Sequence, residues 1–302
     1  MKILLLGKNG QVGWELQRSL APLGEVLALD RHSTHPCGDL SRPEELMQTA
    51  LNYRPDVIVN AAAHTAVDKA EGEPELARLL NATAPAALAE AAQQLGALLV
   101  HYSTDYVFNG EGQVPWQESD VTAPLNVYGQ TKREGELAIA KSGCQHLIFR
   151  TSWVYASRGA NFAKTMLRLA GERERLTVID DQFGAPTGAD LIADVTAQAI
   201  RQVRALPASE QHAGIFHLVA AGQTSWHGYA SHVIEIAKRL KPESEWRVQE
   251  LAPVPSTAYV TAAQRPHNSR LATARLEASF GLRMPAWQDG VERMLAEILS
   301  PS

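Results

Sequence analysis

Apolar and polar residues alternate in blocks along the first half of the chain, and the period within each block indicates one type of element. Short continuous apolar runs predict buried strands at 2–6, 26–29, 56–60, 98–103 and 146–150. Between them, apolar residues spaced about four apart predict helices at 11–20, 43–53, 81–95 and 131–141. Strands that alternate with helices over short connections specify an α/β fold with a doubly wound parallel sheet.

The pattern becomes less regular after residue 151. Helical periodicity returns at 162–170, 191–203, 229–240 and 287–299. Segments that contain proline, such as 251–255 and 265–266, lie between these stretches. We therefore expect a smaller α/β domain folded onto the first. Because no Gly/Ser linker divides the chain, we expect an extensive interface between the two parts.

Composition excludes several classes of protein. With 302 residues, 45% of them hydrophobic and 20% charged, the chain can bury a sizeable core. The formal net charge of -5 gives no support for a nucleic-acid groove or a polybasic membrane surface. Two cysteines, Cys37 and Cys144, cannot form a disulfide framework or a four-thiolate zinc site. Since the sequence contains neither a signal peptide nor an apolar run of about eighteen residues, we expect a cytoplasmic protein with no membrane or nucleic-acid partner.

Three glycines follow the first predicted strand. Gly7, Gly10 and Gly13 stand at G-x-x-G-x-x-G spacing, between that strand and the first predicted helix. The first glycine permits a tight turn, the second lets the backbone approach a pyrophosphate, and the third lets the helix pack closely. The free N–H groups of the helix N-terminus favour phosphate binding. Because an acidic residue, Asp30, ends the second strand about twenty residues later, the pattern predicts a dinucleotide site.

The residues at the next strand ends leave the choice of dinucleotide open. The carboxylate of Asp30 can bind the adenosine ribose hydroxyls and favours NADH, whereas Arg31 can hold a 2′-phosphate and favours NADPH. Both readings stay open here. Asp39-Leu40 and Ala61-Ala62-Ala63 lie near later strand ends. Their small side chains at 61–63 either leave space for the cofactor or simply allow close packing.

A tyrosine and a lysine follow the fourth strand at a spacing that suits ketone reduction. Tyr128 precedes Lys132 by four residues, so the two share one face of a helix. Reduction of a ketone needs a proton donor at the oxygen, and a nearby ammonium brings the tyrosine pKa closer to neutrality. Thr104, at the end of the fourth strand, is placed to bond the carbonyl and tune that acidity. We expect these three residues to form the catalytic group.

Together these motifs resemble the extended short-chain dehydrogenase/reductases. The resemblance rests on the glycine loop, NAAA at 60–63, STDYVF at 103–108 and the Tyr128/Lys132 pair. Longer strings make the chain similar to the dTDP-4-dehydrorhamnose reductase family, from residue 1 to about 298. These strings are AAAHTAVDKAE at 61–71, RTSWVY at 150–155, DQFGAPT at 181–187 and RPHNS at 265–269. The resemblance implies a Rossmann sheet with a smaller domain for the nucleotide sugar.

The family resemblance implies a reaction and a role for each matching residue. The family reduces the C4 ketone of dTDP-6-deoxy-L-lyxo-4-hexulose (dTDP-4-dehydro-L-rhamnose) to dTDP-L-rhamnose with NADPH or NADH. Carried onto this sequence, Tyr128 is the general acid, Lys132 binds the nicotinamide ribose and lowers the tyrosine pKa, and Thr104 completes the triad. The substrate contacts would be Thr104, Asp105 and Trp153. The dinucleotide contacts would be Gly7, Gly10, Gln11, Val12, Gly13, Asp30, Arg31, Asp39, Leu40, Ala61, Ala62, Ala63, Thr65, Tyr102, Tyr128 and Lys132.

The resemblance also implies domain limits and a metal site. Residues 1–150 and about 188–222 would bind the dinucleotide, and about 151–187 with 223–302 would bind the nucleotide sugar. Some members bind Mg²⁺ at a dimer contact through positions that match Glu15, Asp190 and Glu292. The middle position is usually Glu in the family, and the shorter Asp190 argues against the metal here. We expect a homodimer.

Three other functions compete with the reductase. A nucleotide-sugar dehydratase of the same superfamily places an Asp-Glu pair after the threonine, whereas Asp105 is followed here by Tyr106. An epimerase stays open at this stage. A non-catalytic NADP-binding subunit, such as the regulatory subunit of methionine adenosyltransferase, has no need for a tuned proton donor beside Trp153. Lipopolysaccharide O-antigen is the expected destination of the rhamnose if the source is Gram-negative.

Overall fold

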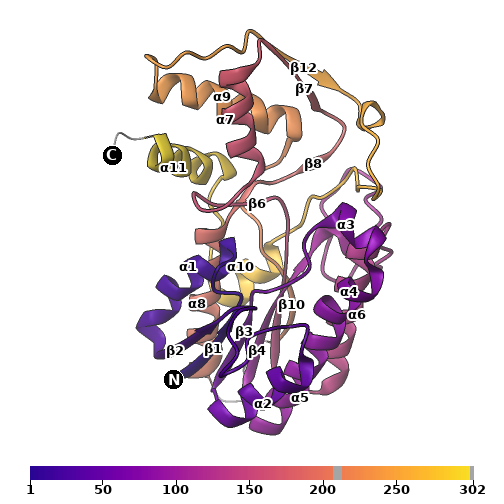
Figure 1. The fold of residues 1–302 in the computed structure, drawn as a ribbon, viewed down its shortest axis with the longest axis vertical. Coiled ribbons are helices and arrows are strands. Elements are labelled where there is room, and N and C mark those ends of the chain that lie inside the picture. Colours follow the sequence, from indigo (N-terminus) through magenta and orange to yellow (C-terminus); the bar gives the residue numbers. More distant parts are fainter. Residues whose placement is uncertain (207–212, 300–302) are drawn as a thin grey trace.

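A six-stranded parallel sheet forms one part of the molecule (Figure 1). The computed structural model describes residues 1–206 and 213–299. The strands lie in the order β10 (Gly214–His217), β5 (His146–Thr151), β4 (Leu98–Thr104), β3 (Val57–Asn60), β1 (Lys2–Leu6) and β2 (Glu25–Leu29). The chain runs outward from β1 to β2 and then returns to β3 on the other side of β1. This reversal between β1 and β3 is the point at which α/β sheets bind ligands.

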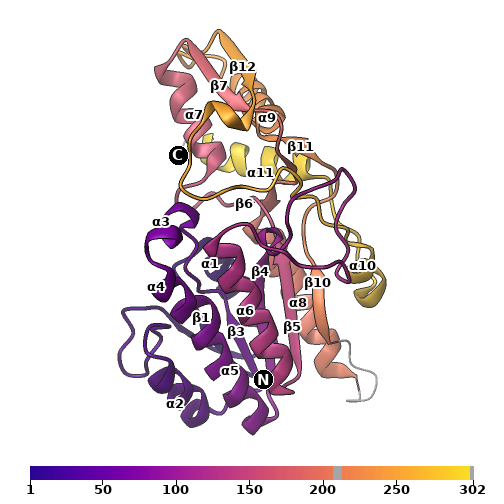
Figure 2. The same cartoon turned by 90° about the vertical axis from the view of Figure 1, so that its right-hand side faces the viewer.

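Helices cover both faces of the sheet (Figures 1 and 2). One face carries α1 (Gln11–Leu20), α8 (Ala189–Ala205) and α10 (Ala274–Phe280). The other carries α2 (Pro43–Tyr53), α5 (Ala84–Leu95) and α6 (Val127–Ser142). Alternate residues of β1 serve the two faces, with Ile3 and Leu5 packed in the first core and Leu4 and Leu6 in the second. Because both faces are buried, β1 and β3 are apolar over most of their length, as the sequence predicts.

A second group of elements lies beyond the carboxyl ends of the strands (Figure 1). Its helices are α7 (Phe162–Glu172), α9 (Trp226–Leu240) and α11 (Trp287–Leu299). Short strand pairs join them: β12 (Glu250–Val254) with β7 (Arg175–Ile179), β11 (Thr224–Ser225) with β8 (Phe183–Gly184), and β6 (Val154–Tyr155) with β9 (Thr187–Gly188). Its core contains Tyr155, Tyr229 and Trp287.

The chain crosses more than once between the two groups. From β5 it enters the second group, returns to the sheet for α8 and β10, and leaves again for α9. It then returns once more, because Leu276 and Phe280 of α10 pack in the core of the sheet. The domain limits expected from the sequence place α10 with the sugar-binding part. These limits stay a prediction. In the structure, α10 packs against the sheet although the limits assign it to the sugar-binding part.

The strands and helices expected in the first half are present, with differences at their ends. The expected helix at 81–95 begins with a π-helical turn at Leu79–Thr83, and the expected helix at 131–141 begins earlier, at Val127. Two short helices, α3 (Val67–Gly72) and α4 (Pro74–Arg78), were not expected. Strand β10 was not expected either, since its four residues include Gly214 and His217 and form no continuous apolar run. Within 1–206 and 213–299, no helix combines the length and apolarity needed to cross a membrane.

Candidate functional site

A cleft of about 850 Å³ opens where the strand order reverses. Its volume lies in the range of small-molecule sites, roughly 300–1,000 Å³. It runs from the glycine loop after β1, past the ends of β3 and β4, to the second group of elements. The residues expected from the sequence that line it are Gly7, Gly10, Gln11, Val12, Asp30, Arg31, Ala61, Ala62, Ala63, Thr65, Tyr102, Thr104, Asp105, Tyr128, Lys132 and Trp153.

At two glycines of the loop, Gly7 and Gly13, the backbone leaves no room for a side chain. Gly7 has φ +85°, and a Cβ there would lie 2.8 Å from the backbone of Ala61. A Cβ on Gly13 would lie 2.0 Å from the carbonyl oxygen of Gly7, so α1 touches the loop directly. Gly10 caps α1 without a side-chain hydrogen bond. The N–H groups of the first turn therefore stay open to an anion, as a pyrophosphate site requires.

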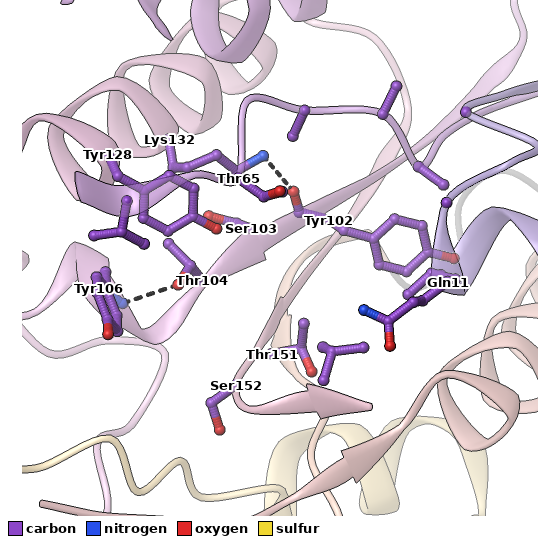
Figure 3. A pocket seen from close by; sticks show the side chains of 18 of the residues that line it. Gln11, Thr65, Tyr102, Ser103, Thr104, Tyr106, Tyr128, Lys132, Thr151 and Ser152 are labelled. Atoms are coloured by element: carbon purple, nitrogen blue, oxygen red, sulfur yellow. Dashed lines mark hydrogen bonds between the residues drawn. The ribbon is translucent and has the colours of Figure 1, made fainter. Parts of the chain in front are cut away.

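Unpartnered polar atoms along the cleft also fit a bound ligand. The side-chain oxygens of Gln11, Ser103, Thr151 and Ser152 are buried and make no hydrogen bond within the part of the chain that the structure describes. All four residues line the cleft, and Figure 3 shows their side chains around it. Buried polar groups normally have partners, so four orphans in one cleft indicate partners supplied by a ligand. Together with the open helix N-terminus, this fits a dinucleotide with a polar substrate beside it.

Asp30 lies at the outer end of the cleft and is half-buried. Its carboxylate accepts a hydrogen bond from the backbone N–H of His32 (2.9 Å), another from the Ser33 hydroxyl (3.2 Å) and one from the Asn9 amide. Burial acts to raise the pKa of Asp30, but the hydrogen bonds from His32 and Ser33 and the charges of Lys8 and His32 outweigh it and hold the pKa below its usual value. Asp30 is therefore an anion that shapes the loop. The neighbouring Arg31 is exposed and also lines the cleft.

Tyr128 is placed in the first turn of α6 by two local features. The Asn126 side chain caps the helix, accepting a hydrogen bond from the Gly129 N–H at 2.8 Å and donating one to the Gln264 carbonyl at 2.7 Å. A Cβ at Gly129 would lie 2.1 Å from the carbonyl oxygen of Tyr106, so only glycine lets α6 approach the turn after β4. The rings of Tyr106 and Tyr128 meet edge to face, with centroids 5.7 Å apart.

The environment of Tyr128 keeps its phenol protonated. Burial raises the pKa of Tyr128 to about 12, and the nearby Asp105 carboxylate acts in the same direction. A hydrogen bond with the Thr104 hydroxyl opposes them. Thr104 also donates to Asp105 Oδ1 at 3.0 Å and accepts from the Tyr106 N–H at 3.2 Å. Burial raises the pKa of Asp105 itself to about 6, against hydrogen bonds that lower it.

Lys132 differs from its expected role in one respect. It lies one turn after Tyr128 on the same helix, as predicted. Its Nζ, however, donates to the carbonyl oxygen of Tyr102 at 2.6 Å and lies 3.1 Å from His101 Nε2 (Figure 3 shows the first contact). It is not among the groups that shift the pKa of Tyr128 in this structure. The expectation that Lys132 lowers this pKa stays a prediction, and in this structure the amine is turned toward β4. Burial lowers the pKa of Lys132 itself to about 8.

Two tryptophans form part of the wall of the cleft. Trp153 and Trp226 are stacked, with ring centroids 3.7 Å apart and planes inclined by 15°. Trp153 has φ +49°, which is uncommon for a residue with a side chain and often marks a functional site. Trp226 Nε1 donates to Gln182 Oε1 at 3.2 Å, which fixes the pair against the second group of elements. Arg265 also lines the cleft and pairs with Asp68 at 2.6 Å.

Some expected site residues lie elsewhere. Leu40 is packed in the core between the sheet and α2, and Asp39 accepts a hydrogen bond from the Ser41 N–H at 2.9 Å. Neither lines the cleft, because the chain after β2 turns away from the glycine loop to enter α2. Gly13 does not line it either, and its place is the contact between α1 and the loop.

The expected metal ligands are not brought together within one chain. Glu15 and Asp190 line one small hollow, where they pair with Arg18 (3.5 Å) and Arg293 (2.5 Å) respectively. Glu292 instead pairs with Arg239 at 2.7 Å. Among the described residues, no group of three or more His, Cys, Asp or Glu side chains could hold a metal ion. Because arginines already neutralise these carboxylates, the single chain does not fit the expected Mg²⁺ site.

Several residues of the cleft were not among the expected contacts. Four of them lie next to expected residues in the STDYVF and RTSWVY strings, so the sequence could have predicted them: Ser103, Tyr106, Thr151 and Ser152. Arg265 opens the quoted RPHNS string. Trp226 had no such signal, since only the packing of α9 brings it to Trp153.

Comparison with known proteins identifies close relatives of the chain. Residues 1–300 match the family model described as RmlD substrate binding domain. A dTDP-4-dehydrorhamnose reductase of Shigella flexneri is 60% identical over 300 residues, which cover 99% of both chains. A solved dTDP-4-dehydrorhamnose reductase of Clostridium acetobutylicum is 34% identical, with a TM-score of 0.89 over 99% of this chain and 100% of that one. The enzyme of that name from Bacillus anthracis, solved in complex with NADP, is 33% identical, with a TM-score of 0.87 over 98% and 99% of the two chains.

Proposed function

This chain belongs to the dTDP-4-dehydrorhamnose reductase family, and we propose that its cleft reduces the C4 ketone of dTDP-4-dehydro-L-rhamnose with Tyr128 as the proton donor. It is an oxidoreductase of dTDP-rhamnose formation that uses NADP or NAD. One observation carries the assignment of the donor. Tyr128 is a half-buried phenol that stays protonated beside the Thr104 hydroxyl, inside the cleft that the glycine loop opens.

The glycine loop and the N-terminus of α1 would hold the pyrophosphate of the dinucleotide, and Asp30 and Arg31 lie where its adenosine ribose would bind. When bound, NAD(P)H supplies the hydride. Lys132 lies beside the catalytic tyrosine at the inner end, where the nicotinamide ribose would lie. Because Asp30 and Arg31 both line the cleft, the preference between NADH and NADPH stays open at this point.

Tyr128 would transfer its proton to the C4 oxygen as negative charge develops there. The Thr104 hydroxyl, within hydrogen-bond reach of both Tyr128 and Asp105, would turn its single proton from Asp105 to that oxygen and hold it beside the tyrosine. Trp153, supported by Trp226, would offer a flat apolar wall to the sugar ring and exclude water from it. Asp105 would accept hydrogen bonds from the sugar hydroxyls at the end of the cleft.

The finer expectations about partners are proposals as well. We propose that the enzyme is a homodimer and that Mg²⁺ takes no part in its reaction, because proton donation by a phenol needs no metal. A homodimer would appear as one species of twice the chain mass in sedimentation equilibrium, unchanged by a chelator. A monomer would contradict the homodimer, and NAD(P)H oxidation that slows on chelation would contradict the proposal on Mg²⁺.

The test of the function is NAD(P)H oxidation by the purified chain. The keto sugar is generated in situ from dTDP-glucose by the upstream dehydratase and epimerase, and NAD(P)H absorbance is followed. We expect oxidation that depends on the keto sugar and yields dTDP-rhamnose. Tight cofactor binding without sugar-dependent oxidation would contradict the proposal.

A further inference from the structure

Lys132 is the end of a buried chain of polar groups that crosses the centre of the sheet. His101 of β4 and Asn60 of β3 lie opposite each other in the sheet register. The Lys132 Nζ lies 3.1 Å from His101 Nε2, and His101 Nδ1 lies 3.2 Å from Asn60 Nδ2. Asn60 Oδ1 accepts the backbone N–H of Ala62 at 3.1 Å. Lys132, His101 and Asn60 are each 1% exposed, so water does not replace any of these contacts.

The Ala62 N–H sets the direction of hydrogen-bond donation along this series of polar groups. The N–H of Ala62 can only donate, so it fixes the Asn60 oxygen toward Ala62 and the Asn60 NH₂ toward His101. His101 Nδ1 must then accept, which puts the proton of a neutral imidazole on Nε2. That Nε2–H points at the Lys132 nitrogen. An ammonium has no lone pair to accept it, whereas a neutral amine does. The amine keeps its own N–H for the Tyr102 carbonyl.

The charged groups around Lys132 do not reverse the direction of hydrogen-bond donation from His101 to the lysine amine. Glu136, one turn later on α6, favours the ammonium but forms two hydrogen bonds, at 2.9 and 2.7 Å, with Arg150 of β5. Glu71 of α3 accepts from the Val127 N–H at the start of α6. From α4, Arg78 binds Glu134 on the exposed side of α6 at 2.8 Å. In the turn after β4, Asp105 interacts with Thr104 and raises the pKa of Tyr128.

We propose that His101 is a positioning residue that, oriented by Asn60, holds Lys132 as the neutral amine in the cofactor-free enzyme. Its meaning for catalysis rests on the proposed function, in which Lys132 serves the catalytic tyrosine. Burial lowers the pKa values of both Lys132, to about 8, and His101, so it shifts each group toward its neutral form.

The arrangement couples Lys132 to the wall of the cleft. When Lys132 takes up a proton, His101 must carry its own proton on Nδ1 instead of Nε2. The Asn60 amide must then rotate to accept that proton, and the Ala62 N–H loses its acceptor. Ala62 lines the cleft in the segment after β3. Protonation of the lysine is thus tied to the backbone that would face the dinucleotide.

The direct test is the tautomer of His101, measured from imidazole ¹⁵N shifts in the full-length enzyme without cofactor. We expect the proton on Nε2 in the wild type. In Asn60→Asp, a carboxylate of nearly the same shape accepts from both the Ala62 N–H and His101, so the proton should move to Nδ1. A wild-type proton on Nδ1, or no change in Asn60→Asp, would overturn the proposal. Neither result depends on turnover, so the proposed function is judged separately by the assay of NAD(P)H oxidation.

The second readout is the titration of the Lys132 amine in ¹⁵N-lysine-labelled enzyme, with its signal identified by its loss in Lys132→Met. Because His101 then accepts from an ammonium, Asn60→Asp should raise the pKa of Lys132 by about one pH unit or more. The double variant Asn60→Asp/His101→Phe keeps the added charge but removes the link, and should lose most of that rise. An equal rise in both variants would overturn the proposal, since charge alone would then explain it.

Discussion

Two aspartates in one cleft show how position decides chemistry. Asp30 at the outer end is half-buried, and hydrogen bonds from a backbone N–H and from side chains hold its pKa below the usual value. Asp105 at the inner end is 2% exposed, and burial raises its pKa to about 6. The same side chain is thus a fixed anion at one end and, at the other, a carboxyl that keeps its proton up to about pH 6. Desolvation, which hydrogen bonds offset only in part at the inner end, makes the difference.

The same contrast separates binding from proton transfer. The outer end consists of glycine backbone, an open helix N-terminus and exposed charges, which suit phosphates and ribose hydroxyls. The inner end holds a half-buried tyrosine with a buried lysine and a buried aspartate, within one turn of α6 and the end of β4. A dry site strengthens each electrostatic effect, so we expect substitutions at the inner end to alter the rate and those at the outer end to alter cofactor affinity.

The largest effect should come from Tyr128→Phe, which removes only the proton donor of the inner end. We expect kcat to fall by about 10²- to 10⁴-fold, the usual contribution of a general acid, with cofactor affinity unchanged. Steady-state NAD(P)H oxidation and a separate cofactor titration measure the two quantities. A rate near that of the wild type would contradict the assigned donor, and a loss of cofactor affinity would mean that the two ends are not separable.

Next in size is the pH dependence of stability caused by Asp105. The native carboxyl keeps its proton up to about pH 6, whereas the unfolded one loses it near 3.8. Between these values the native state binds more protons, so the contribution of Asp105 to the free energy of unfolding falls as pH rises, by about 3 kcal/mol in total. Asp105→Asn removes this contribution. Urea unfolding of both proteins should show that the free energy of unfolding of the variant rises relative to that of the wild type from pH 4 to pH 7. A difference that stays constant over this range would refute the assigned role of Asp105.

Gly13→Ala probes the contact between α1 and the glycine loop. The new Cβ would lie 2.0 Å from the Gly7 carbonyl oxygen, so the helix or the loop must shift. We expect a cost of about 1–3 kcal/mol, seen as weaker dinucleotide binding in calorimetry and a lower urea midpoint. Gly171→Ala in α7 is the matched control, because a Cβ there meets no atom within 4 Å. Equal behaviour of the two variants would exclude the close contact as the reason for the glycine.

The smallest effect is expected at the outer end. Removing the carboxylate in Asp30→Ala should favour NADPH over NADH, because the anion no longer repels a 2′-phosphate, by about 1 kcal/mol or roughly fivefold in the ratio of kcat/KM. Asp39→Ala is the matched control, since Asp39 does not line the cleft. If only Asp39→Ala shifts the preference, or neither variant does, the ribose role of Asp30 is wrong.

Much of the fold and part of the site could be predicted because they depend on local sequence. Continuous apolar runs identify five of the sheet's strands, since strands buried on both faces must be apolar. The glycine loop and the Tyr128/Lys132 pair are each contained within seven residues. Strand β10 has no such pattern, and its pairing with β5 comes from the fold as a whole.

The remainder of the site depends on contacts between distant segments. Trp226 reaches Trp153 only through the packing of α9, and Asp39 and Leu40 leave the cleft only because the chain turns into α2. Helical spacing correctly places Tyr128 and Lys132 on one face, but it does not show that the amine turns to the Tyr102 carbonyl. Nor does it give the burial that raises the pKa values of Tyr128 and Asp105.

The central claim is that the inner end keeps Tyr128 protonated in the enzyme before any ligand binds. The most direct measurement is the ultraviolet difference spectrum of phenolate formation against pH, taken as wild type minus Tyr128→Phe without cofactor. We predict no phenolate from Tyr128 up to about pH 10, where a free tyrosine is half ionised. Ionisation of Tyr128 between pH 7 and pH 9 would contradict the account and support the expectation that Lys132 lowers its pKa.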